Sequence, residues 1–181
     1  TDMLVHNWQY SNWINLNANF VLIKQETGLF LLHVKRFQEI YLREQLKNMP
    51  LPFASRNLLV PISIAISNDL DKLEASFELF AEIGITLSWL TENTLLIRTI
   101  PLITPNLDLK GFILKVLSYK IQDITKQVIL QELINHSSID TLAISDIEKE
   151  KWGDYLAKKN NVCNNYLKAL TIETLELFFH A

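Results

Sequence analysis

The stretch NFVLIKQETGLFLLHV, residues 19–34, predicts a β-hairpin. Two apolar runs rich in β-branched and aromatic residues enclose a polar turn, which Gly28 closes. Both runs are almost continuously apolar, a pattern typical of strands that are covered on both sides. We therefore expect helices of the same chain, or a partner chain, to cover both faces of this sheet.

The residues that follow predict a helix and then a break. Residues 36–48 place apolar side chains such as Phe37 and Ile40 on one side and charged side chains such as Glu39 on the other. The segment NMPLPFAS, residues 48–55, then carries two prolines within three residues, which interrupt regular structure. We expect the chain to cross from one subdomain to another here.

A compact α/β unit is expected next. The clean alternation of residues 57–66 predicts a half-buried strand, and Pro61 favours an edge position or a strand entry for it. Residues 69–84 predict a helix, with Asn68 as its N-cap and Gly84 as its left-handed C-terminal residue. The other elements expected in this unit are strands at 85–90 and 95–102 and a helix at about 107–121.

The rest of the chain, residues 125–181, shows the apolar spacing of three and four that is typical of helices. The predicted helical segments are 125–134, 150–170 and 171–179. The fold class is thus mixed α/β (α+β), with two ends of the chain that enclose a middle unit.

Composition excludes several classes of protein. The 181 residues are 49% hydrophobic, enough for a buried core, yet no apolar run is long enough to span a bilayer and no signal peptide is present. A net charge of −3 argues against an autonomous nucleic-acid-binding protein. The single cysteine, Cys163, excludes an internal disulfide and fits the reducing cytoplasm. Because the chain begins at Thr1 without an initiator methionine, we expect it to be part of a longer protein.

The sequence contains no common catalytic or cofactor motif. The four histidines have neither the spacing nor the cysteine partners of a zinc site, and no glycine-rich phosphate loop is present. Cys163 lies in an apolar-spaced segment and is interpreted as a packed small hydrophobe. The segment with Trp8 and Trp13 is interpreted as a linker that docks on the domain or on a partner subunit. The histidines are His6, His33, His136 and His180.

Four segments occur in the order of a known family: VLIKQETGLFLLHV, LLVPISIAI, a helix that ends in LFAEIG, and LLIRTIP. From about Phe20 to Phe178, the chain resembles the C-terminal dimerisation domain of the DNA mismatch repair protein MutL. The family's short motifs correspond to Leu58–Pro61, Leu79–Gly84 and Ile97–Pro101.

This resemblance implies a two-part fold. An inner, dimerising subdomain consists of residues 1–54 and 125–181, and an outer α/β subdomain of residues 55–124 is inserted between them. The apolar hairpin and the terminal helices are the expected homodimer interface. Its candidate residues are Phe20, Val21, Leu22, Leu29, Leu31, Leu175 and Phe178.

Many members of the family are metal-dependent nicking endonucleases, with the motif D-Q-H-A-x-x-E-x-x-x-x-E where this chain has residues 33–44. Only Glu39 and Glu44 remain here, and by helical geometry they point roughly 140° apart. The residues that replace the motif's first four are His33, Val34, Lys35 and Arg36, of which the last two oppose cation binding by like charge. Cys163 matches the family's cysteine motif, without its basic neighbour. We therefore expect neither catalytic nor metal-binding residues.

The resemblance also implies a short motif that binds the sliding clamp, in which a glutamine precedes an apolar run that ends in proline. The corresponding residues are Arg56, Asn57, Leu58, Leu59, Val60 and Pro61. The apolar anchors match, while Arg56 stands where a glutamine amide makes the specific hydrogen bonds. Retained clamp binding and lost clamp binding both remain open.

The function expected from the resemblance is a non-catalytic homodimerisation module, without a cofactor, that holds two ATPase arms together. ATP is expected only in an N-terminal domain that this chain lacks. The expected partners of the full-length protein are MutS, a separate nicking endonuclease and a helicase, with at most weak contact to DNA and none to membranes. The alternatives are a nicking endonuclease with a degenerate site and an unrelated α/β interaction domain.

Overall fold

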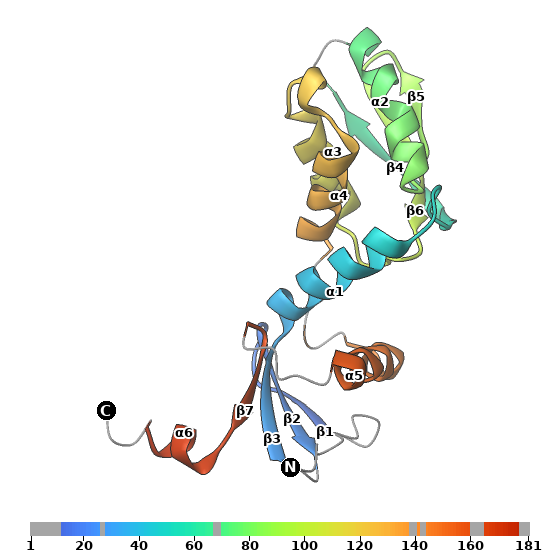
Figure 1. The fold of residues 1–181 in the computed structure, drawn as a ribbon. Coiled ribbons are helices and arrows are strands. Elements are labelled where there is room, and N and C mark those ends of the chain that lie inside the picture. The colour runs from blue at the N-terminus through green and yellow to red at the C-terminus, as the bar shows by residue number, and fades with distance from the viewer. Residues whose placement is uncertain are drawn as a thin grey trace. The chain divides into compact units, whose positions relative to one another are not determined.

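The computed structural model describes residues 12–25, 28–66, 70–137, 141, 144–159 and 165–177 (Figure 1). Over these residues the fold is mixed α+β, with six α-helices and two antiparallel sheets, which confirms the predicted fold class. The backbone divides into two compact units, which we call unit 1 (residues 1–40 with 139–181) and unit 2 (residues 41–138).

Unit 1 is built on a four-stranded antiparallel sheet of order β1-β2-β3-β7. The predicted hairpin is confirmed as β2 (Phe20–Gln25) and β3 (Gly28–His33), with Gly28 at a positive φ of 150°. β1 (Asn12–Asn15) and β7 (Leu167–Leu170) complete the sheet on either side of this hairpin.

The prediction of a helix through residue 170 was wrong. The helix in this region, α5, ends at Lys159 after starting at Asp146, and residues 167–170 pair with β3 as β7. The sequence LKAL favours a helix by intrinsic propensity, but a four-residue strand is decided by the neighbour with which it exchanges hydrogen bonds. A short helix, α6 (Ile172–Glu176), follows β7.

Helices α1 (Val34–Asn48) and α5 supply aromatic side chains to the core of unit 1. The Phe37 ring lies at the centre of this cluster, with centroid distances of 5.0 Å to Trp152, 5.7 Å to Tyr155 and 5.2 Å to Tyr166. Trp13 of β1 lies 6.3 Å from Trp152, so α5 packs beside this sheet (Figure 1). Trp13 thus docks on its own domain, and Trp8 lies outside the described residues.

Unit 2 contains a three-stranded antiparallel sheet of order β4-β6-β5. Its strands are β4 (Ser55–Ala65), β5 (Leu87–Thr91) and β6 (Thr94–Pro101), and its helices are α2 (Leu70–Glu82), α3 (Leu109–Leu117), the 3-10 turn η2 (Ile121–Asp123) and α4 (Lys126–Asn135). Figure 1 shows α3 and α4 side by side. The range of unit 2 extends beyond the predicted 55–124 range at both ends and includes half of α1 and all of α4.

One core fills unit 2, because α2, α3, α4 and all three strands contribute apolar side chains to it. Phe80, Ile97, Phe112 and Ile129 are fully buried there, and the Phe80 and Phe112 rings lie 6.0 Å apart. The edge position of Pro61 and the left-handed Gly84, at φ +83°, are both confirmed. The predicted N-cap Asn68 lies outside the described residues. Within the described ranges, no helix has the length and hydrophobicity needed to cross a membrane.

Candidate interaction surface

The two faces of the four-stranded sheet differ in how they are covered. Val21, Ile23, Phe30 and Leu32 share one face, and each is at most 3% exposed. This is the face on which Trp13, the partner of Ile23 in the β1–β2 register, contacts α5. We call it the covered face.

The opposite face, which we call the open face, is also apolar but only partly covered. Cross-strand pairing places Leu22 between Ile14 and Leu31, and Leu29 between Lys24 and Leu170. Ile14 is 48% exposed, and the leucines are half-buried. The apolar residues of the open face are Ile14, Phe20, Leu22, Leu29, Leu31 and Leu170. Two exposed cations, Lys24 and Lys168, stand among them.

The predicted interface residues that the structure describes lie on the open face, on the covered face and on α6. Phe20, Leu22, Leu29 and Leu31 lie on the open face, whereas Val21 lies on the covered face and is fully buried within its own chain. Neighbouring residues of a strand point to opposite faces, and a continuously apolar run conceals which face is which. Leu175 lies on α6 with 39% exposure, and Phe178 lies outside the described residues. Sequence reasoning missed Ile14 and Leu170, because their strands were not predicted.

Helix α6 is exposed along its whole length. Every side chain from Thr171 to Leu177 is exposed, including Ile172 at 74% and Leu177 at 70%. Thr171 caps the helix by accepting a hydrogen bond from the Thr174 N–H at 3.2 Å. Figure 1 shows α6 leading away from β7. We call residues 171–177 the C-terminal arm.

The junction of β3 and α1 is where the nuclease motif was sought. His33 has a local structural role, because its Nδ1 accepts a hydrogen bond from the Arg36 N–H at 3.4 Å. Its ring contacts Phe20 edge-on at 4.8 Å, and its own N–H donates to the Tyr166 carbonyl at 2.7 Å. The His33 imidazole thus accepts a hydrogen bond from a backbone N–H in the first turn of α1, where no partner within the helix is available.

The two glutamates of the motif lie further along α1. Glu39 and Glu44 are half-buried on α1, and Cys163 lies outside the described residues. Among the residues whose placement is described, no three histidine, cysteine, aspartate or glutamate side chains are grouped closely enough to hold a metal ion.

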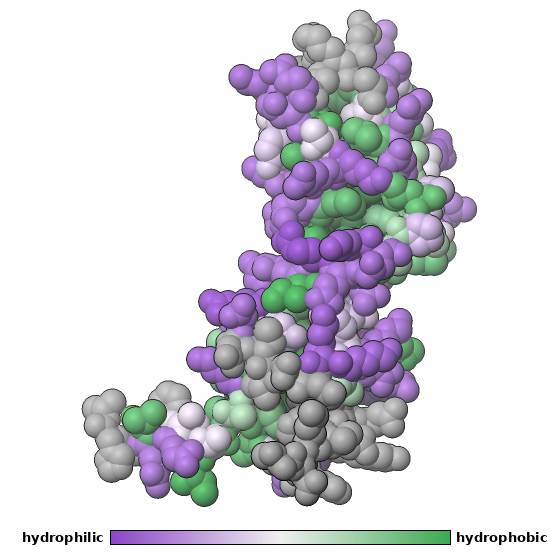
Figure 2. Space-filling model, in the orientation of Figure 1, coloured by the Kyte–Doolittle hydropathy of each residue, from purple (hydrophilic) through white to green (hydrophobic). Residues whose placement is uncertain are grey.

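The proposed clamp motif forms a bulge at the edge of unit 2. Asn57 pairs with Thr99 and Ile62 pairs with Ile97, so four residues of β4 lie opposite Arg98 alone. The Leu59 side chain is 100% exposed and that of Val60 is 77% exposed. Figure 2 shows hydrophobic surface, in green, over β4 and β6 of this unit. We call residues Leu58–Pro61 the β4 bulge.

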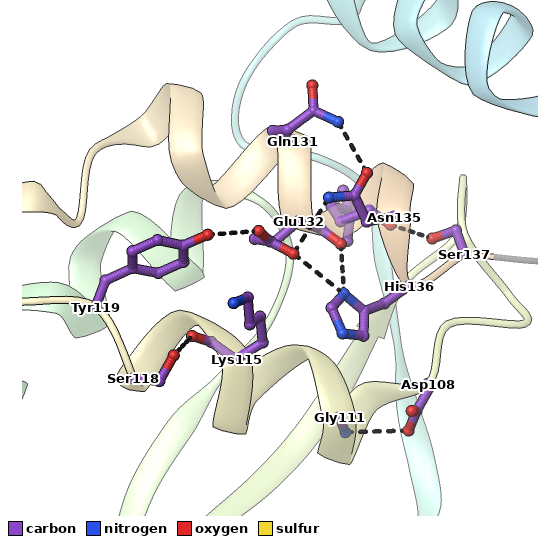
Figure 3. Close-up of polar contacts among 11 residues, drawn as sticks. Asp108, Gly111, Lys115, Ser118, Tyr119, Gln131, Glu132, Asn135, His136 and Ser137 are labelled. Atoms are coloured by element: carbon purple, nitrogen blue, oxygen red, sulfur yellow. Dashed lines mark hydrogen bonds and ion pairs between the residues drawn. The ribbon is translucent and has the colours of Figure 1, made fainter.

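A polar network between α3 and α4 was not predicted (Figure 3). The Glu132 carboxylate is 8% exposed, and its Oε1 accepts a hydrogen bond from the Tyr119 hydroxyl at 2.7 Å. Its Oε2 accepts one from the Asn135 Nδ2 at 3.3 Å and lies 3.5 Å from the His136 Nδ1. The hydrogen bond to Glu132 raises the pKa of Tyr119 above its usual 10.0, with smaller contributions from burial and from the negative charge of Glu132.

This network joins the end of α3 to α4. A buried carboxylate is costly unless hydrogen bonds satisfy its oxygens, and Tyr119 and Asn135 donate the hydrogen bonds that do so for Glu132. The His136 Nδ1 lies closer to the backbone carbonyl oxygen of Glu132, at 2.9 Å, than to its carboxylate. The Lys115 Nζ lies 5.2 Å above the centre of the Tyr119 ring. Tyr119 and Glu132 are 13 residues apart, so no local pattern in the sequence marks the pair.

Comparison with known proteins concerns most of this chain. The family model described as the MutL C terminal dimerisation domain matches residues 14–151, which is more than half of the 181 residues. The matched range runs from β1 into α5, so β7 and the C-terminal arm lie outside it. No curated protein sequence matches the chain.

Proposed function

Because the chain belongs to the MutL C-terminal dimerisation domain family, with a role in DNA mismatch repair, we propose that it is a non-catalytic homodimerisation module. We place its interface on the open face of the four-stranded sheet. The two copies meet through the same surface, as in most symmetric dimers.

The observation that supports this interface is the apolar character of the open face. Leu22, Leu29 and Leu31 form its centre and are only half-buried within one chain. Contiguous apolar surface of this kind marks an interaction site in most proteins, because its removal from water is worth about 25 cal/mol per Å². A second copy that packs on this face covers its apolar side chains and, by symmetry, has its own open face covered in return.

The work of such a module is mechanical. In a full-length MutL, two ATPase arms are expected to precede the dimerised domains. Their closure then becomes an intramolecular event, at an effective concentration that linker length sets. We propose that ATP acts on those arms and that MutS, a nicking enzyme and a helicase engage the assembled protein.

The absence of catalysis is part of this proposal, and the strand–helix junction supports it. His33 stands where the nuclease motif has its aspartate, and it is engaged in the start of α1. Lys35 and Arg36 are exposed beside it and oppose a cation by like charge. A degenerate nicking endonuclease is the alternative.

Sedimentation velocity tests dimerisation directly. We expect a dimer at tens of micromolar protein, and the dimer population should fall on dilution according to a single dissociation constant. A monomer over the whole concentration range would contradict the proposed function.

A nicking assay separates the module from the endonuclease. Supercoiled plasmid incubated with the chain and manganese should stay supercoiled. Metal-dependent nicking that Glu39→Ala abolishes would establish the alternative. Glu78→Ala is the control, because Glu78 is an exposed glutamate of α2, a helix that does not belong to the strand–helix junction.

The β4 bulge is a second candidate surface, which we propose binds a sliding clamp through Leu59 and Val60. The full exposure of Leu59 supports this proposal, because a short apolar motif binds only if its anchors reach the partner. Surface plasmon resonance with purified clamp provides the test.

In that experiment, Leu59→Ser should weaken binding and Arg56→Gln should strengthen it by supplying the motif's amide. Leu90→Ser is the matched control, since Leu90 is an exposed leucine of β5, 56% exposed. Equal responses from all variants and the unaltered chain would remove the bulge as a clamp site.

A further inference from the structure

We propose that the C-terminal arm of each copy docks on the open face of the other copy. In this arrangement Ile172 and Leu175 contact the partner's apolar residues, and Glu173 and Glu176 lie toward its lysines. The inference rests on the proposed homodimer and specifies a segment of each copy that contacts the other.

The first observation is the exposure of the arm's apolar side chains. Ile172, Leu175 and Leu177 are 74%, 39% and 70% exposed, all within six residues. Isolated helices this short are unstable in water, so a five-residue helix depends on a surface to pack against. The arm therefore needs a docking surface.

The second observation is that the arm continues directly from the open face. Leu170, the last residue of β7, belongs to that face through its pairing with Leu29. Thr171 then caps α6. A second copy that covers the open face lies beside the point where the arm begins, which makes it the nearest partner for Ile172 and Leu175.

The third observation is charge complementarity. The arm carries two exposed glutamates, Glu173 and Glu176. The open face carries two exposed lysines, Lys24 beside Leu29 and Lys168 beside Leu31. Exposed ion pairs add little affinity, but they set orientation and reject wrong partners. Apolar contact thus supplies the affinity of the arm, and these pairs fix its direction.

Two double variants test the charge pairing. The arm variant is Glu173→Lys with Glu176→Lys, and the face variant is Lys24→Glu with Lys168→Glu. Each should raise the dissociation constant of its own homodimer about tenfold, because like charges then meet at both contacts. A mixture of the two should form heterodimers preferentially, since opposite charges meet again at both contacts.

The mixture of the two variants distinguishes docking of each arm on the other copy from two other arrangements of the arms. An arm that folds back on its own chain would not be rescued by mixing and would overturn the proposal. Arms that pair only with each other would leave both variant homodimers as strong as the original, which would also overturn it. Circular dichroism confirms that all variants are folded.

An apolar variant tests the same contact independently. Leu175→Asp should weaken the dimer at least about tenfold, because a carboxylate replaces a buried leucine at the interface. Leu114→Asp is the matched control: Leu114 is a leucine of α3 with a similar exposure of 43%. A dimer that tolerates Leu175→Asp would overturn the exchange while leaving dimerisation intact. If the unaltered chain is monomeric, the proposed function itself fails.

Discussion

The two sheets of this protein treat their outward faces differently. In the three-stranded sheet, the row outside the core is Ser63, Leu96 and Ser88, and Arg98 donates to the Ser88 hydroxyl at 3.4 Å. In the four-stranded sheet, the corresponding row is Ile14, Leu22, Leu31 and Lys168. The first row holds two serines and one leucine, whereas the second holds three apolar residues and one lysine, and contiguous apolar surface indicates a partner.

This contrast underlies our proposal that the two copies meet through the sheet of unit 1 rather than through that of unit 2. Unit 2 buries Phe80 and Phe112 completely within its own core. Unit 1 buries one face of its sheet to the same degree and leaves the other face only half-buried, and this is the face that we propose a second copy covers. The following changes test that division, from the largest expected effect to the smallest.

Phe112→Ala should lower the free energy of unfolding of unit 2 by about 3–5 kcal/mol, because it leaves a cavity beside Phe80 and His136. Urea denaturation measures this loss. Dimerisation at low temperature should be unchanged, since the open face belongs to unit 1. Loss of the dimer in folded Phe112→Ala protein would break the distinction between the units.

Leu22→Asp should raise the dissociation constant of the dimer at least about 100-fold, equivalent to about 3 kcal/mol, because an unpaired carboxylate would be buried at the interface. Sedimentation velocity measures the change. Leu96→Asp is the matched control, because Leu96 is a half-buried leucine on the outward face of the other sheet. Equal weakening by both variants would show that the two faces do not differ as inferred.

Glu132→Ala should destabilise unit 2 by about 1–3 kcal/mol, because Tyr119 and Asn135 lose a buried acceptor. Glu148→Ala on α5 provides a comparison for the removal of a less buried carboxylate, since Glu148 is half-buried. Urea denaturation of both variants at neutral pH measures the difference. No loss from Glu132→Ala would mean that the network contributes nothing to the packing of α3 on α4.

Tyr119→Phe should have the smallest effect, and that effect should depend on pH. The folded pKa of Tyr119 lies above its unfolded value of about 10, so its contribution to stability is fully present below pH 10. The contribution is lost as pH rises through the folded pKa. The difference in unfolding free energy between the original and Tyr119→Phe should therefore shrink above pH 10, and a constant difference would argue against the hydrogen bond to Glu132.

Local patterns predicted much of this fold. The two runs around Gly28 form β2 and β3, and Gly84 ends α2 in the left-handed region. Residues 57–65 lie in β4 as predicted, but the β4 bulge interrupts their alternation and leaves Val60 77% exposed. In each case the signal lies within a few neighbouring residues, where strand period and turn chemistry act.

The features that sequence reasoning missed depend on distant partners. β7 forms because residues 167–170 meet β3, more than 130 positions earlier in the chain. Val21 was assigned to the interface with Leu22, although only the observed register shows that Val21 faces the covered side. The surroundings of Glu132 likewise become visible only when α3 and α4 pack together.

The β4 bulge also affects how the chain behaves among many copies of itself. β4 is an edge strand, and the free N–H and C=O groups of an edge can recruit further strands into an aggregate. Four consecutive residues leave the regular ladder at the bulge, and Pro61 has no N–H to donate. An incoming strand therefore meets an interrupted row of donors and acceptors. In the proposed dimer the sheet of unit 1 contacts one further copy, whereas the edge of unit 2 resists strand addition, and this combination favours an assembly that stops at two.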